Sequence, residues 1–129
     1  MIVVFVYLLS IIAFLNAILH LVLLFGAPLG EYVLGGKYRI IPKKKRFINA
    51  ILFLLFAFLG TVYLQYMSII SIYMPKTINL IIIGFFAIFF AYGIIGNLKF
   101  TKSKKERNTM TPVCIVSLIC SIILLISIW

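Results

Sequence analysis

The chain has 129 residues, of which 65% are hydrophobic and 11% are charged, and its formal net charge is +10. Its mean hydropathy of +1.27 is far above that of soluble globular proteins. A nucleic-acid-binding module is also basic, but it needs a water-exposed surface that follows phosphates. The composition therefore indicates a membrane protein and argues against nucleic acid as a partner.

Apolar runs occur four times along the chain, at residues 2–25, 47–67, 77–98 and 112–129. Each is close to the ~20 residues that a helix needs to cross about 30 Å of hydrocarbon. Helix is the required form, because a lone strand would leave backbone N–H and C=O groups unpaired in lipid. We predict an all-α, membrane-embedded antiparallel four-helix bundle, with residues 1–129 as a single transmembrane domain.

The first run lacks the basic start and the small-residue cleavage site of a signal peptide, so we expect it to remain as the first span. Small residues recur at helical spacing in all four runs and predict close helix contacts. These stripes are Ser10, Ala13 and Ala17; Ala50, Ala57, Gly60 and Thr61; Gly84, Ala87 and Ala91; and Cys114, Ser117 and Ser121.

Basic residues are distributed unevenly between the runs, with six in the first connection, Lys76 alone in the second and five in the third. The positive-inside rule places the first and third connections in the cytoplasm, so both termini are expected outside. The aromatic residues Tyr63, Tyr66, Tyr73 and Trp129 fall at the predicted outer ends, where such rings favour the headgroup layer. Both signals predict the same topology.

The basic clusters determine topology, and they are also candidates for contact with anionic lipid headgroups, at ~1 kcal/mol per basic residue near the surface. The candidate residues are Lys43, Lys44, Lys45, Arg46, Lys104 and Lys105. The bilayer is thus the one partner that the sequence requires. A membrane-protein partner or a homo-oligomer is compatible with it.

Thr111 and Pro112 fit an N-cap followed by proline at the first helical position, which predicts that the fourth helix starts there. Cys114 and Cys120 lie six residues apart on this helix and therefore point in different directions, so they cannot bond to each other. With one His and two acidic residues in the whole chain, we expect no metal site and no cofactor.

The connection from Gly26 to Pro42 contains too many helix breakers to continue the first span, yet its first half is too apolar for a solvated loop. It could fold back against the bundle as an interfacial or re-entrant element. Glu31 and Tyr32 would then lie under the cytoplasmic mouth of the bundle. Alternatively, Glu31 pairs with Lys37, Arg39 or Arg107 and only fixes the loop.

Asn16 and His20 are four residues apart and share one face of the first helix, beside its small residues. A polar or ionisable group within a membrane helix is costly and is therefore a candidate for function. Asn49 and Asn97 lie at the same predicted membrane face. The predicted binding residues are Asn16, His20, Glu31, Tyr32, Asn49 and Asn97, with interhelical hydrogen bonding as the structural alternative.

The segments HLVLLFGAPLGEYVLGGKYRIIP and NLKFTKSKKERNTMTP resemble a family of small four-span bacterial integral membrane proteins of unassigned function. Leu29, Ile41 and Thr101 depart from the family's pattern. The resemblance implies a multi-pass protein of the bacterial cell membrane in which both cytoplasmic loops matter together. The matching residues are His20, Gly26, Ala27, Pro28, Gly30, Gly35, Gly36, Pro42, Asn97, Ser103, Glu106, Arg107 and Pro112.

Two classes of function follow from these residues. The first is a non-enzymatic protein that binds or passes a small molecule or lipid, or serves as a subunit of a membrane complex, through the cytoplasmic polar mouth. The second is a membrane enzyme acting on a lipid, in which His20 and Glu31 serve as acid and base and have to meet within hydrogen-bond reach. No carboxylate lies within a predicted span, so a proton-coupled carrier would have to use His20.

Overall fold

The computed structural model describes residues 2–33, 36–66, 74–101 and 103–128. The described part is all-helical, and four of its helices are long and apolar enough to cross a membrane. Both findings agree with the predicted membrane-embedded helical bundle. The long helices are α1 (Ile2–Leu24), α2 (Arg46–Tyr66), α3 (Lys76–Ile95) and α4 (Lys104–Ile128).

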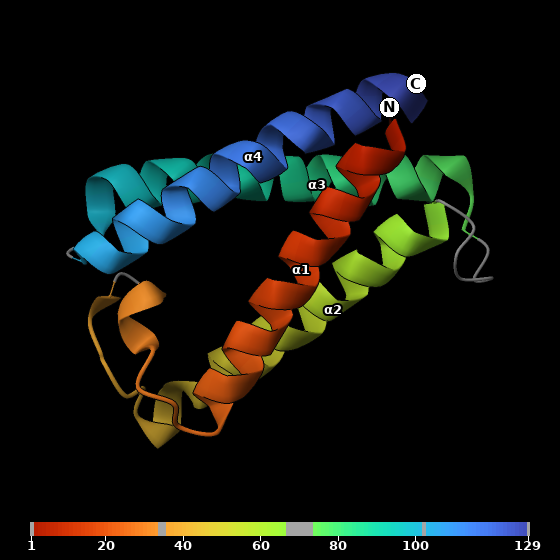
Figure 1. The fold of residues 1–129 in the computed structure, drawn as a ribbon. Coiled ribbons are helices and arrows are strands. Elements are labelled where there is room, and N and C mark those ends of the chain that lie inside the picture. The colour runs from red at the N-terminus through yellow and green to blue at the C-terminus, as the bar shows by residue number, and fades with distance from the viewer. Residues whose placement is uncertain (1, 34–35, 67–73, 102, 129) are drawn as a thin grey trace.

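The four helices form two antiparallel hairpins, because α1 packs along α2 and α3 packs along α4. The hairpins touch mainly through α1 and α4, whereas α2 and α3 barely meet. They converge at the end that carries both chain termini and diverge toward the other end, where the connection after α1 lies (Figure 1). We call the converging part the closed half, and the end where α1 leads to α2 and α3 leads to α4 the basic end.

The closed half contains the main core, in which side chains from all four helices are fully buried, among them Leu9, Leu59, Ile83 and Leu124. Tyr63 belongs to this core and is 0% exposed. Its ring therefore faces the other helices, and its position at headgroup depth stays a prediction. Tyr73 and Trp129, predicted to lie in the same layer, are outside the described residues.

Several predicted small residues mark close helix contacts. A Cβ on Gly60 of α2 would lie 2.7 Å from the Phe14 ring of α1. A Cβ on Gly93 of α3 would lie 2.9 Å from the Cys114 Sγ of α4. A Cβ on Gly84, in contrast, would meet nothing within 4 Å, so that glycine does not mark a contact. Ser10, Ala13, Ala17, Ala87, Ser117 and Ser121 are buried as expected.

The fourth helix begins at Lys104, so the prediction of a start at Thr111 and Pro112 is wrong. The Ser103 Oγ caps it by accepting the backbone N–H of Glu106 at 3.3 Å, which is the spacing of a capping box. Pro112 lies inside the helix. It leaves the carbonyl of Asn108 without its helical donor, and Asn108 is exposed, so that carbonyl can be satisfied from outside.

A π-helical turn (η4, Gly96–Phe100) ends the α3 hairpin arm and carries the buried Asn97. The backbone N–H of Thr101 closes this turn on the carbonyl of Gly96 at 3.0 Å. Such turns are rare and widen the helix locally. Here the turn directs the side chain of Asn97 inward.

The connection after α1 folds back onto the bundle, as the sequence predicts. A 3₁₀ turn (η1, Gly30–Tyr32) contacts α4, and a second one (η3, Lys43–Lys45) leads into α2. Val33 and Ile41 are buried with Leu23 in a small apolar cluster. Gly36 has φ +68° and touches the side chain of Ser103, so a larger residue would be strained and would collide there.

Candidate functional site

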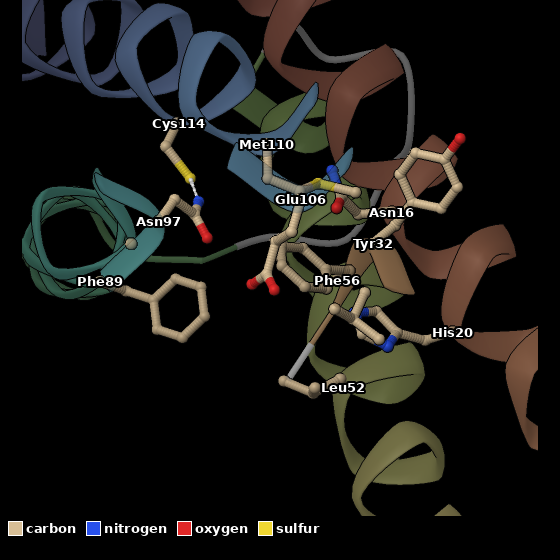
Figure 2. Close-up of a pocket in the computed structure, with 12 residues that line it drawn as sticks. Asn16, His20, Tyr32, Leu52, Phe56, Phe89, Asn97, Glu106, Met110 and Cys114 are labelled. Atoms are coloured by element: carbon tan, nitrogen blue, oxygen red, sulfur yellow. Dashed lines mark hydrogen bonds between the residues drawn. The ribbon is translucent and has the colours of Figure 1, made fainter. Parts of the chain in front are cut away.

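A cleft of about 160 Å³ lies between the diverging hairpins at the basic end. All four long helices contribute to its wall, and Tyr32 and Val33 of the folded-back connection complete it (Figure 2). Its other lining residues are Asn16, His20, Leu52, Phe56, Phe89, Gly93, Asn97, Glu106, Met110 and Cys114. Four of the six predicted binding residues, Asn16, His20, Tyr32 and Asn97, therefore meet at one place.

His20 is held by α2. Its Nδ1 lies 2.9 Å from the Oδ1 of Asn49, which is itself fully buried, and its ring stacks on Phe56 with centroids 5.8 Å apart. A carboxamide oxygen only accepts, so the Nδ1 carries the hydrogen in this pair. The Nε2 of a neutral His20 is then a hydrogen-bond acceptor. Asn49 does not line the cleft, but it orients His20 through this hydrogen bond between α2 and α1.

The two other asparagines of the site use their NH₂ groups within the protein. Asn16 donates from its Nδ2 to the carbonyl of Ile12 at 2.9 Å. Asn97 donates from its Nδ2 to the Cys114 Sγ at 3.7 Å. In both side chains the amide oxygen, which can only accept, and the second N–H of the NH₂ group remain.

Glu106 is a lining residue that we did not predict as part of the site. Its side chain is 8% exposed, and its carboxylate accepts a hydrogen bond from the Thr101 hydroxyl at 2.8 Å. In Figure 2 the carboxylate extends toward the rings of Phe89 and Phe56, which meet edge to face with centroids 6.0 Å apart. The predicted helix start at Thr111 left residue 106 in a loop, although the spacing Ser103-x-x-Glu106 signals a helix start. This correction brings a carboxylate into the first turn of a spanning helix.

Glu31 is not one of the residues that line the cleft with His20. Its carboxylate forms an ion pair with Lys105 of α4 at 2.8 Å, on the half-exposed side of the connection. The hydrogen bond and the charge of Lys105 hold the pKa of Glu31 below its usual value. The structure therefore does not bring together the acid–base pair that the enzyme hypothesis requires. It supports the expectation that Glu31 fixes the loop, but the partner is Lys105 and not Lys37, Arg39 or Arg107 as predicted.

The predicted lipid-contacting residues have different surroundings. Lys43, Lys44 and Lys104 are exposed, whereas Lys45 donates to the hydroxyl of Tyr38 at 3.1 Å. That hydrogen bond lowers the pKa of Tyr38. Arg46 turns inward and donates from its Nε to the carbonyl of Ile41 at 2.9 Å, which closes the connection at its α2 end. Lipid contact by these residues stays a prediction.

Within the described residues, no group of three or more His, Cys, Asp and Glu side chains is placed to hold a metal ion. Cys114 and Cys120 are both free thiols. A comparison of the chain with protein-family models, with curated proteins and with solved structures found no match. The geometry of the cleft is therefore the basis for a functional proposal.

Proposed function

We propose that this polytopic membrane protein binds a small molecule or lipid in the cleft at its basic end, without catalysing a reaction on it. The observation that carries the proposal is the convergence of α1, α2, α3, α4 and the folded-back connection on one cleft. Sites of this kind combine apolar walls with a few placed polar groups. Leu52, Phe56 and Phe89 are such walls, and the polar groups are those of Asn16, His20, Asn97 and Glu106.

The sparse contact between α2 and α3 supports access from the bilayer. Leu52 and Phe56 form the α2 side of the cleft and Phe89 forms the α3 side. These helices barely touch, apart from the rings of Phe56 and Phe89, which meet edge to face with centroids 6.0 Å apart, so an apolar chain would leave the cleft past this ring pair. On the opposite side α1 packs against α4. The fold thus favours a ligand that reaches the cleft sideways.

We place the basic end at the cytoplasmic face of a bacterial cell membrane, with both termini outside. The support is the concentration of eleven of the twelve Lys and Arg residues in the first and third connections. A C-terminal fluorescent-protein fusion should stay dark and a C-terminal alkaline phosphatase fusion should be active. The opposite pair of results would invert the topology. We also propose that Lys43 and Lys44 contact anionic lipids, that the protein associates with other chains, and that it is related to the small four-span bacterial membrane proteins that its sequence resembles.

The test is native mass spectrometry of the protein purified in mild detergent from its own membrane. The wild-type protein should carry a reproducible adduct. Leu52→Trp fills the cleft and should remove it, whereas Leu54→Trp is the matched control, because Leu54 is 64% exposed on the same helix. An adduct that survives in Leu52→Trp, or that is absent from the wild-type protein, would refute binding in the cleft.

A further inference from the structure

We propose that the ligand presents a protonated amine to the cleft, joined to an apolar chain that leaves between α2 and α3. This inference rests on the proposed binding function and names the chemical class of the ligand. It is drawn from the hydrogen-bonding character of the cleft, from its charge and from its size.

Most of the polar groups left over in the cleft are acceptors. Asn16 and Asn97 each donate one N–H within the protein and keep one, and the Nδ1 hydrogen of His20 is directed to Asn49. The acceptors that remain are two amide oxygens, the imidazole Nε2 and the Glu106 carboxylate, and they outnumber the two remaining amide N–H donors. A complementary ligand therefore has to donate several hydrogen bonds, and an ammonium group offers up to three N–H donors at one atom.

The charge of the cleft has the opposite sign to that of the chain. The net charge is +10, yet the described residues that line the cleft include the Glu106 carboxylate and neither a lysine nor an arginine. The rings of Phe56, Phe89 and Tyr32 also line it, and the faces of aromatic rings attract cations. An anionic ligand would meet the Glu106 carboxylate and three further acceptors, the two amide oxygens and the imidazole Nε2. A cationic donor fits both features.

The volume limits how much of the ligand the cleft can enclose. A cleft of about 160 Å³ is well below the ~300 Å³ at which pockets for drug-sized ligands begin. It is enough for an amine group and its first neighbouring carbon atoms. The remainder of an amphipathic amine has to lie outside, along Leu52 and Phe89 in the bilayer.

Two sources supply this chemistry, the ethanolamine headgroup of a phospholipid and a free long-chain amine. They are separated by binding measurements on the purified full-length protein. Native mass spectrometry in detergent with dodecylamine, dodecanol and dodecanoate tests the free amine. Nanodiscs that contain phosphatidylethanolamine or phosphatidylcholine test the headgroup, because a trimethylated ammonium has no N–H to donate.

We expect dodecylamine to bind at least about tenfold more tightly than dodecanol, since hydrogen bonds to charged groups are worth ~1.5–3 kcal/mol each. Dodecanoate should bind most weakly. Glu106→Gln should abolish the preference for the amine, and its melting temperature without ligand should stay close to that of the wild type, because glutamine can still accept from Thr101. Glu31→Gln removes the same charge at the same end outside the cleft, so it should keep the preference.

The outcomes separate this inference from the proposed function. If all three dodecyl probes bind equally and Leu52→Trp removes them, the cleft binds ligands but does not select amines, and the inference is wrong. A preference for dodecanoate, or an amine preference that persists in Glu106→Gln, would also overturn it. If no probe and neither lipid binds, the proposed function fails together with the inference. Retention of phosphatidylethanolamine without dodecylamine assigns the site to the lipid headgroup.

Discussion

The closed half and the cleft contain similar polar residues but use them differently. In the closed half, Ser117 and Ser121 are fully buried among apolar side chains, and Ser10 donates its hydroxyl only to the carbonyl of Val6 in its own helix. At the basic end, His20 lies on the same helix as Ser10 but reaches α2 and also lines a cleft. Whether a polar side chain is buried in the core or can reach a ligand therefore depends more on the spacing between the hairpins than on the residue type.

The largest expected effect comes from forcing the closed half apart. Gly60→Leu would drive its side chain into the Phe14 ring, because even a Cβ lies 2.7 Å from it. Overpacking of this kind should lower the free energy of unfolding by about 3 kcal/mol. Gly84→Leu is the matched control, since a Cβ there meets nothing within 4 Å. Thermal unfolding in detergent measures both variants, and equal losses would show that α1 and α2 do not depend on this contact.

A smaller loss of unfolding free energy is expected where the closed half meets the cleft. His20→Ala removes the partner of the fully buried Asn49 and leaves its amide oxygen unpaired, which should cost about 1–3 kcal/mol of unfolding free energy. The same variant should lose the bound ligand. Ser10→Ala, whose hydroxyl bonds only within α1, should change neither quantity. A variant of His20 that melts lower but keeps the ligand would mark this residue as structural only.

These two predictions depend on features that the sequence revealed to different extents. Helix positions follow from the apolar runs, and the pairing of small residues on helix faces was also visible. The start of α4 was not visible in the sequence, because the polar turns from Lys104 to Thr111 resemble a solvated loop in a hydropathy profile. The proline at position 112 suggested a helix start, although a spanning helix can accommodate it.

The site was predictable in its parts but not in its assembly. His20 and Asn16 stood out because polar groups in apolar runs are conspicuous. Glu106 did not, because its role depends on the helix start and on Thr101. The divergence of the hairpins, which creates the cleft, leaves no local pattern in the sequence. It arises from the way in which α1 meets α4 while α2 and α3 stay apart.

A moderate effect is expected where the connection meets α4. Gly36→Ala would place a side chain at φ +68° and against Ser103, at a cost of about 1–2 kcal/mol for the backbone conformation alone. The connection should separate from α4, so trypsin should cleave faster after Lys37 and Arg39. Gly96→Ala is the control, because it has open space and a helical φ of −61°. Unchanged cleavage in Gly36→Ala would mean that this contact does not hold the connection in place.

The smallest expected effect concerns the ion pair between Glu31 and Lys105. Because its folded-state pKa is lowered from the usual 4.5, Glu31 contributes stability above that pH and loses it as the pH falls through the lowered value. Glu31→Gln should therefore melt slightly below the wild type at pH 7. The difference should shrink as the pH falls below 4.5 and through the lowered pKa of Glu31. A difference that grows with acidification would contradict this assignment.

The contact between Gly36 and Ser103 also constrains the order in which the protein can be assembled. The connection after α1 is synthesised early, but the residue against which it packs follows much later in the chain. During synthesis this connection cannot pack in its final position until α4 has been made. A nascent chain that stops before residue 103 would therefore expose the connection to proteases, and acquisition of resistance would report the completion of the second hairpin.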